Sequence, residues 1–212
     1  MSSALRSYGD PCGIARALDL VGERWSLLVV RELVLGSKRF TDLKAGLTGA
    51  SPNVLSQRLR ELEAGGVVRR SSEGAATYEL TDWGRELHPL LVQLGLWGAR
   101  SSAKPKGPLS PDAMMVALES TFQPTRAATL RVSLELQLDE QRYAVRVDRG
   151  KMTVVRGAMP APDVVIDTDV ATLRKSVFGH DVEPQGVGMR GDVKRGRAFL
   201  KLFARPKPNP DA

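Results

Sequence analysis

The apolar residues of this chain repeat with two different periods, and the change falls at a segment rich in proline and serine. Before residue 100, apolar residues recur every three or four positions, which predicts amphipathic helices. After residue 130 they alternate with polar residues, which predicts half-buried strands. Residues 101–111 hold three prolines, three serines and one glycine, a composition that resists regular structure. We therefore predict two domains, at residues 1–100 and 112–205, joined by a linker at 101–111 and followed by a tail at 206–212.

The first domain is predicted to contain a helix-turn-helix followed by a hairpin. Periodicity predicts helices at residues 14–21, 25–35, 40–47 and 52–64, and strands at 67–70 and 77–80. Ser51 can cap the fourth helix, Pro52 suits its first position, and Gly65 can help to end it. A further helix begins near Thr81, and Pro89 is expected to kink it or to mark a restart.

The fourth helix has a polar face of specific chemistry. Its leucines fall on one stripe, and the opposite face carries Asn53, Ser56, Gln57 and Arg60. Amide side chains can bond to the N6 and N7 atoms of adenine, and a guanidinium can bond to the O6 and N7 atoms of guanine. This face therefore indicates contact with bases in the major groove. The alternative is an ordinary solvated polar face.

Four segments of the first domain carry a family resemblance. Residues 12–25, 39–43, 51–63 and 78–84 resemble, in the expected order, HxlR-type winged helix-turn-helix transcription regulators. The resemblance implies a homodimer that binds operator DNA through a recognition helix and a wing. Gly13 departs from the family pattern, in which proline usually follows the cysteine.

Charge is consistent with a polyanionic partner. Lys and Arg number 31 against 24 Asp and Glu, for a formal charge of +7, and between Lys38 and Arg70 there are seven basic and three acidic residues. Nucleic acid and an anionic membrane both fit this excess. Arg58 could serve the DNA backbone or an internal ion pair, and any single basic residue could be ordinary surface charge. The candidate DNA-binding residues are Lys38, Arg39, Ser51, Asn53, Ser56, Gln57, Arg58, Arg60, Arg69, Arg70 and Ser72.

Cys12 is the only cysteine, so no intramolecular disulfide can form. Some relatives of the HxlR type sense oxidants or electrophiles through an N-terminal cysteine, and a dimer could link two such thiols. Arg16 lies one helical turn away, but Asp10 is close by, so no low thiol pKa is guaranteed. Cys12 is therefore either a redox site or an inert thiol.

The second domain is predicted to be a smaller α+β domain with a mainly antiparallel sheet covered by helices. Strands are predicted at 130–138, 143–147, 152–156 and 164–167, and helices at 111–122, 170–178 and 193–204. Asp169 and Asp192 can cap the last two helices. Residues 162–168, 189–193 and 198–203 resemble a sterol-carrier-protein-type lipid-binding fold. That resemblance implies an apolar cavity and leaves its occupant unidentified.

Two helical faces allow more than one interpretation. The apolar stripe of Leu87, Leu90, Leu91, Leu94 and Trp97 could contact a second copy of the chain or pack on its own domain. The last helix is predicted to place Lys194, Arg197, Lys201 and Arg205 on one face. That face could touch anionic lipid or the DNA backbone, or it could simply be solvated.

The sequence offers no catalytic constellation. His88 and His180 are the only histidines and lack metal-ligand spacing, and the match to G-x-G-x-x-G at 186–191 lacks the strand that a dinucleotide site needs before it. We expect no enzymatic activity, no cofactor and no metal. The N-terminus lacks a secretory signal and no membrane-length apolar run occurs, so a cytoplasmic protein without integral membrane association is expected.

Together these features predict a homodimeric, sequence-specific DNA-binding transcriptional regulator. Its DNA affinity is expected to respond to an apolar small molecule bound in the second domain. The alternative is a lipid-binding or transfer protein whose first domain serves mainly for dimerisation. The expected partners are double-stranded DNA, a second copy of the chain and the small molecule.

Overall fold

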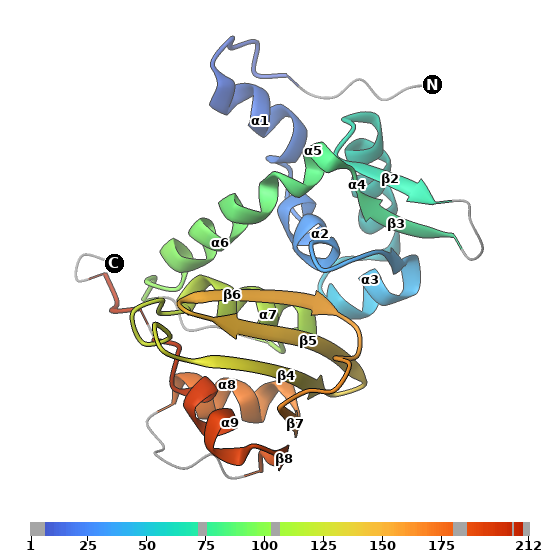
Figure 1. The fold of residues 1–212 in the computed structure, drawn as a ribbon. Helices are drawn as coiled ribbons and strands as arrows, with labels where there is room; N and C mark the ends of the chain where they lie inside the picture. Colours follow the sequence, from blue (N-terminus) through green and yellow to red (C-terminus); the bar gives the residue numbers. More distant parts are fainter. Residues whose placement is uncertain (1–6, 72–75, 103–106, 180–185, 205, 210–212) are drawn as a thin grey trace. The chain divides into compact units, whose positions relative to one another are not determined.

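The computed structural model describes residues 7–71, 76–102, 107–179, 186–204 and 206–209 (Figure 1). The chain divides into two compact units, Met1–Leu91 and Val92–Ala212. This division lies within helix α6 (Leu87–Gly98), ahead of the proline-rich segment at which the composition predicts it. The difference arises because α6 contributes to both units: Leu91 packs in the first core, and Gly95 lies against Ser120 in the second. No described helix has the length and apolar character needed to cross a lipid bilayer.

The first unit has the helices and the hairpin that periodicity predicts. Its elements before α6 are α1 (Gly13–Val21), α2 (Ser26–Leu33), β1 (Lys38–Arg39), α3 (Phe40–Gly46), α4 (Pro52–Ala64), β2 (Val68–Ser71), β3 (Thr77–Leu80) and α5 (Asp82–Arg85). The sheet order is β1-β3-β2, with both pairings antiparallel. Strand β1, only two residues long, was not predicted, because so short a segment has no period of its own.

Helix α4 is fixed in this unit by its leucine stripe. Leu55, Leu59 and Leu62 are at most 1% exposed and belong to the core of the first unit, as predicted. The backbone N–H of Val54 donates to Ser51 Oγ at 3.3 Å, which confirms the predicted cap. Gly66, with φ of +71°, then turns the chain into β2 without the steric cost that a side chain would add.

The helix after the hairpin restarts before its proline. Helix α5 ends at Arg85 and α6 begins at Leu87, so Pro89 falls in the first turn of α6. The N–H groups of a first turn have no intrahelical acceptor, and a proline there costs no hydrogen bond. Leu87 and Leu91 pack toward the first core, whereas Leu90, Leu94 and Trp97 are exposed. Only part of the apolar stripe is therefore buried in the first unit, and the rest faces solvent.

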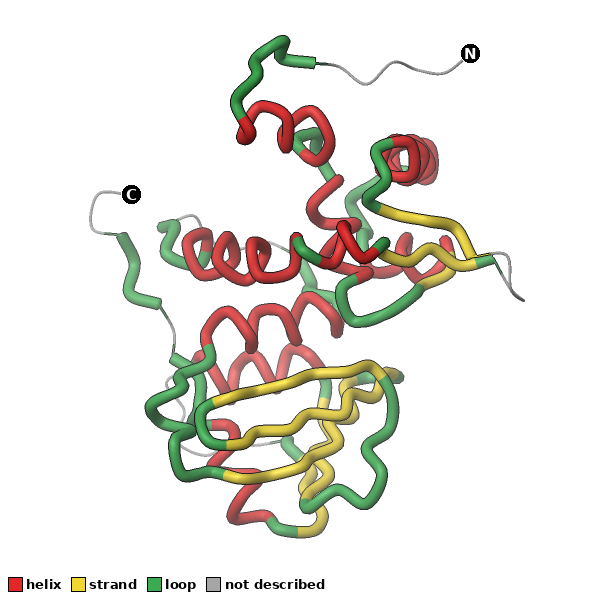
Figure 2. The backbone as a smooth tube through the Cα atoms, turned by 45° about the horizontal axis from the view of Figure 1, so that its top comes forward, coloured by secondary structure: helices red, strands yellow, loops and turns green. Residues whose placement is uncertain are grey.

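The second unit is a β-sheet with helices packed on its buried face. Its elements after α6 are α7 (Pro111–Thr121), β4 (Arg131–Leu138), β5 (Gln141–Asp148), β6 (Lys151–Arg156), β7 (Val164–Thr168), α8 (Val170–Phe178), β8 (Gly188–Gly191) and α9 (Val193–Leu200). The order is β6-β5-β4-β7-β8, and among these described strands β4–β7 is the one parallel pairing. Strands β4, β5 and β6 follow one another as an antiparallel meander (Figure 2). The mainly antiparallel sheet is thus confirmed.

Alternation along β4 has the predicted effect. Val132, Leu134, Leu136 and Leu138 are buried, and Arg131 and Ser133 face the other side. The buried face receives α7 through a bond between Tyr143 and Asp112, and α9 through the approach of Gly196 to Val164. The caps of α8 and α9 are Asp169 and Asp192, as predicted.

The last helix is shorter than its periodicity predicts. Helix α9 ends at Leu200, not at residue 204. Beyond it, Phe203 forms an antiparallel bridge with Phe122, and the N–H of Gln123 donates to the Leu202 carbonyl at 2.8 Å. These backbone bonds require an extended chain, so the prediction of helix up to residue 204 was wrong.

Candidate nucleic-acid interface

The polar face of α4 lies at the surface of the first unit. Asn53 and Arg60 are exposed, and Ser56 and Gln57 are partly exposed. Arg60 Nη2 donates to Gln57 Oε1 at 2.6 Å, and Gln57 Nε2 donates to Glu61 Oε1 at 2.7 Å. These bonds restrict the rotamers of the predicted base-contacting side chains, which lowers the entropy lost when they bind a ligand. Glu61 was not among the predicted site residues, although its spacing of four residues from Gln57 on a helix could have indicated this contact.

Two other predicted contacts on α4 have structural partners. Arg58 Nη1 lies 2.7 Å from Glu61 Oε2 and 3.2 Å from Glu23 Oε2, and the Arg58 side chain is only 14% exposed. Of the two alternatives open for Arg58, the structure contains the internal ion pair. Ser51 is exposed, and its hydroxyl accepts the capping bond of α4.

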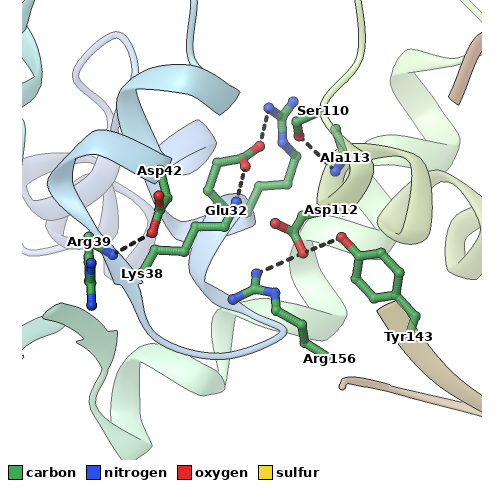
Figure 3. Close-up of polar contacts among 10 residues, drawn as sticks. Glu32, Lys38, Arg39, Asp42, Ser110, Asp112, Ala113, Tyr143 and Arg156 are labelled. Atoms are coloured by element: carbon green, nitrogen blue, oxygen red, sulfur yellow. Dashed lines mark hydrogen bonds and ion pairs between the residues drawn. The ribbon is translucent and has the colours of Figure 1, made fainter. Parts of the chain in front are cut away.

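Lys38 lies in an ion-pair cluster between α2 and β1 (Figure 3). Its Nζ is 2.6 Å from Glu32 Oε2, and Arg31 Nη2 is 2.8 Å from Glu32 Oε1. The Glu32 carboxylate is fully buried, and the Lys38 side chain is 11% exposed. This ammonium is therefore engaged by a carboxylate inside its own unit. The neighbouring Arg39 is exposed, and its backbone N–H donates to Asp42 Oδ2 at 3.2 Å (Figure 3).

The hairpin carries two exposed arginines. Arg69 Nε donates to Glu79 Oε1 at 2.8 Å across the β2–β3 pair, and this hydrogen bond and the Glu79 charge raise the pKa of the Arg69 guanidinium. The Arg70 guanidinium carbon lies 5.9 Å from the centre of the Tyr78 ring, within cation–π range. The Arg69 guanidinium therefore stays positive at physiological pH. Ser72, the last predicted contact, lies outside the described residues.

Comparison with known proteins assigns a family to this arrangement. The HxlR-like helix-turn-helix family matches residues 20–105. The uncharacterized HTH-type transcriptional regulator YvaP of Bacillus subtilis is 41% identical over 86 residues, which cover 39% of this chain and 80% of YvaP. The chain belongs to the HxlR-like helix-turn-helix family. A second relative, the uncharacterized HTH-type transcriptional regulator Rv3095 of Mycobacterium tuberculosis, is 41% identical over 99 residues, covering 45% of this chain and 62% of Rv3095.

One solved structure that matches this HxlR-like chain also covers less than half of it. The crystal structure of the HTH-type regulator ytcD matches at 34% identity with a TM-score of 0.40, covering 42% of this chain and 94% of ytcD. The family match ends at residue 105, so most of the second unit lies beyond it.

Cys12 is exposed in this HxlR-like chain and lies at the N-cap of α1. Its backbone N–H donates to Asp10 Oδ1 at 2.8 Å, which brings the Asp10 carboxylate close to the cysteine. A redox role for Cys12 remains a prediction.

The second unit contains a buried polar cluster that was not predicted (Figure 3). Tyr143 Oη donates to Asp112 Oδ1 at 3.0 Å, and Arg156 Nη2 donates to the same oxygen at 2.7 Å. Burial, followed by the charge of Asp112, raises the pKa of Tyr143 well above its ordinary value, so the hydroxyl stays protonated and donates. The cluster joins α7 to β5 and β6. Strand alternation would place Tyr143 and Arg156 inward, but nothing in the sequence pairs them with Asp112.

Proposed function

We propose that the chain is a sequence-specific DNA-binding transcriptional regulator. The observation that carries this proposal is the exposed amide and guanidinium face of α4, formed by Asn53, Gln57 and Arg60 on a helix whose leucine stripe is buried. A recognition helix requires both properties, because one side must anchor it while the other meets base edges in the major groove. The HTH-type regulators that the chain resembles support this assignment.

We propose different roles for the predicted contacts. Arg39 and Arg70 are exposed and are suited to contact phosphate groups of the DNA backbone. Arg69 can also contact a phosphate while its Nε keeps the hydrogen bond to Glu79. Lys38 and Arg58 are better explained as parts of internal ion pairs, and Ser51 as a helix cap. Asn53, Ser56, Gln57 and Arg60 remain the proposed base contacts.

A homodimer is part of the proposal. Leu90, Leu94 and Trp97 follow one another at helical spacing along α6 and are 62%, 46% and 73% exposed. Ile14 on α1 is 73% exposed. Exposed apolar side chains in such numbers favour burial against another chain. A two-fold dimer would present two copies of α4 to two half-sites.

A small-molecule effector in the second unit is proposed from the resemblance to sterol-carrier-type folds. Such a ligand can change DNA affinity only if it binds the DNA-competent and incompetent states unequally, and typical couplings are about 1–3 kcal/mol. We assign no catalytic role to the chain.

A binding assay tests the central claim. Fluorescence anisotropy would measure the affinity of the full chain for DNA from upstream of its own gene and for a scrambled duplex, over a series of salt concentrations. We expect a preference for the natural site, and we expect Gln57→Ala with Arg60→Ala to remove it, since each bidentate base contact provides about 1–3 kcal/mol of discrimination.

The matched control is Gln93→Ala with Arg85→Ala, which removes the same two groups from exposed positions outside α4. The control should keep the full preference. Survival of the preference in the α4 variant would overturn the proposed recognition face. No preference and no salt dependence in the unmodified protein would instead support the lipid carrier.

A further inference from the structure

The excess positive charge of the chain is concentrated in the second unit. Residues 92–212 contain nineteen Lys and Arg against thirteen Asp and Glu, a balance of +6. Residues 1–91 contain twelve against eleven, a balance of +1. The helix-turn-helix unit is thus nearly neutral. The basic character of the chain needs an explanation beyond the recognition helix and hairpin.

Helix α9 carries a row of uncompensated cations. Lys194, Arg197 and Lys201, the last of them the C-cap residue after Leu200, are spaced by three and four residues, which places them on one side of the helix, and all three are exposed. Arg205, the fourth residue predicted for this face, lies outside the described residues. None of their side chains pairs with an acidic group among the described residues. Arg195, on another side of α9, lies 3.2 Å from Asp163 and 3.3 Å from Asp192. The neighbouring carboxylates therefore pair with Arg195 and not with Lys194, Arg197 or Lys201. We call these three residues the α9 row.

The α9 row is held on a rigid support. Asp192 caps the helix by accepting from the N–H of Arg195 at 3.0 Å. Phe199 and Leu200 are buried, and Gly196 approaches Val164 so closely that there is little room for a side chain. The orientation of the row is thus set by the fold before any ligand binds, which reduces the entropy cost of binding.

The burial of the apolar side of α9 favours DNA over an anionic membrane as the partner of the α9 row. A helix that binds at a membrane surface buries its own apolar side chains in the lipid, in addition to making electrostatic contacts. On α9 the large apolar side chains Phe199 and Leu200 are already used inside the unit, and only Val193, 40% exposed, is available. The DNA backbone requires no apolar contact, because charge neutralisation and counterion release supply its affinity.

We infer that Lys194, Arg197 and Lys201 form a second DNA contact, which binds the phosphate backbone without reading sequence. The row extends over seven residue steps, or about 10 Å of helix. That length corresponds to about three base-pair steps along the axis of the duplex, since each strand carries one phosphate per roughly 3.4 Å of axis. This inference rests on the proposed function and adds to it an affinity that does not depend on the operator. The second unit then holds the regulator on DNA while α4 selects the site.

The test replaces the row in the full chain by Lys194→Gln, Arg197→Gln and Lys201→Gln. Affinity would be measured for the upstream site and for a random duplex from low to high salt. Each phosphate contact contributes about 0.9 units to the slope of log affinity against log salt concentration. We expect the slope to become shallower by about three units on both duplexes, with the ratio of the two affinities unchanged.

The matched control removes three cations from exposed sheet positions of the same unit, by Arg131→Gln, Arg146→Gln and Lys151→Gln. The control should keep the original slope. An unchanged slope in the α9 variant, or an equal change in the control, would overturn the inference. The inference would also be overturned if the α9 variant kept its DNA affinity but lost binding to phosphatidylserine vesicles. Thermal melting of each variant checks that the fold is intact.

The proposed function can fail without this inference failing. A protein that binds both duplexes equally, with a slope that the α9 variant reduces, would refute site recognition and support the α9 row. A protein that prefers its site, but whose α9 variant has the same salt slope as the unmodified protein, would support site recognition and refute the α9 row. Absence of DNA binding in the unmodified protein would refute both.

Discussion

Among single residues, Glu32 shows how a charged side chain can hold the helix-turn-helix unit together. Its carboxylate is fully buried and receives Arg31 on one oxygen and Lys38 on the other. We expect Glu32→Ala to lower the free energy of unfolding by about 3 kcal/mol, because it leaves buried or partly buried cations without their carboxylate. Urea denaturation followed by tryptophan fluorescence would measure the loss.

Arg85→Ala is the control, since it breaks an exposed ion pair with Asp82 and should cost less than about 1 kcal/mol. Equal losses in the two variants would show that the cluster around Glu32 contributes little. The sequence could not reveal this cluster. Lys38 has the residue type and the position of a phosphate contact. Its ion pair with Glu32 forms only because the turn after α2 brings Lys38 back to that helix.

At the scale of elements, the sequence predicted most of this fold because each helix and strand buries one face of its own. The leucine stripe of α4 and the alternation in β4 are local patterns, and the apolar side of each is buried as its period predicts. Glu135, on the polar side of β4, is an exception, because it is buried as well. Strand β1 and the parallel pairing of β4 with β7 depend on segments far apart in the chain, so local periodicity could not predict them. The same limit applied to the candidate site: exposure of the α4 face followed from its period, whereas the partners of Arg58 and Lys38 did not.

Contact between α5 and the start of the hairpin depends on a glycine. A Cβ at Gly84 would collide with the backbone carbonyl oxygen of Val67, and that oxygen also accepts from the N–H of Thr81 at 3.1 Å. Since backbone on both sides must move, we expect Gly84→Ala to reduce the free energy of unfolding by about 1–3 kcal/mol. Gly13→Ala is the matched control, because no atom lies within 4 Å of its Cβ position, and it should raise stability by no more than about 1 kcal/mol. Urea midpoints of both variants provide the comparison, and a neutral Gly84→Ala would mean that α5 can shift freely.

At the scale of the whole molecule, the two units differ in what they leave exposed. The first unit is nearly neutral and presents the specific polar face of α4, whereas the second carries almost all of the net charge. Helix α6 adds an apolar stripe that neither core uses in full. The sequence predicted that stripe and left its use open, because burial of Leu87 and Leu91 becomes visible only when the cores are assembled.

The exposed part of the α6 stripe predicts the oligomeric state. We expect the unmodified protein to sediment as a dimer and Leu90→Glu with Trp97→Glu to sediment as a monomer, because burying two carboxylates without partners costs more than the contact returns. The monomer should also bind a single half-site with the affinity of one α4, and should lose the added affinity of a two-site operator. Val155→Glu with Val193→Glu is the control, since both valines are exposed apolar residues outside α6 and this pair introduces the same charge. A dimer that persists in the α6 variant, or one that dissociates equally in the control, would place the contact between subunits elsewhere on the chain.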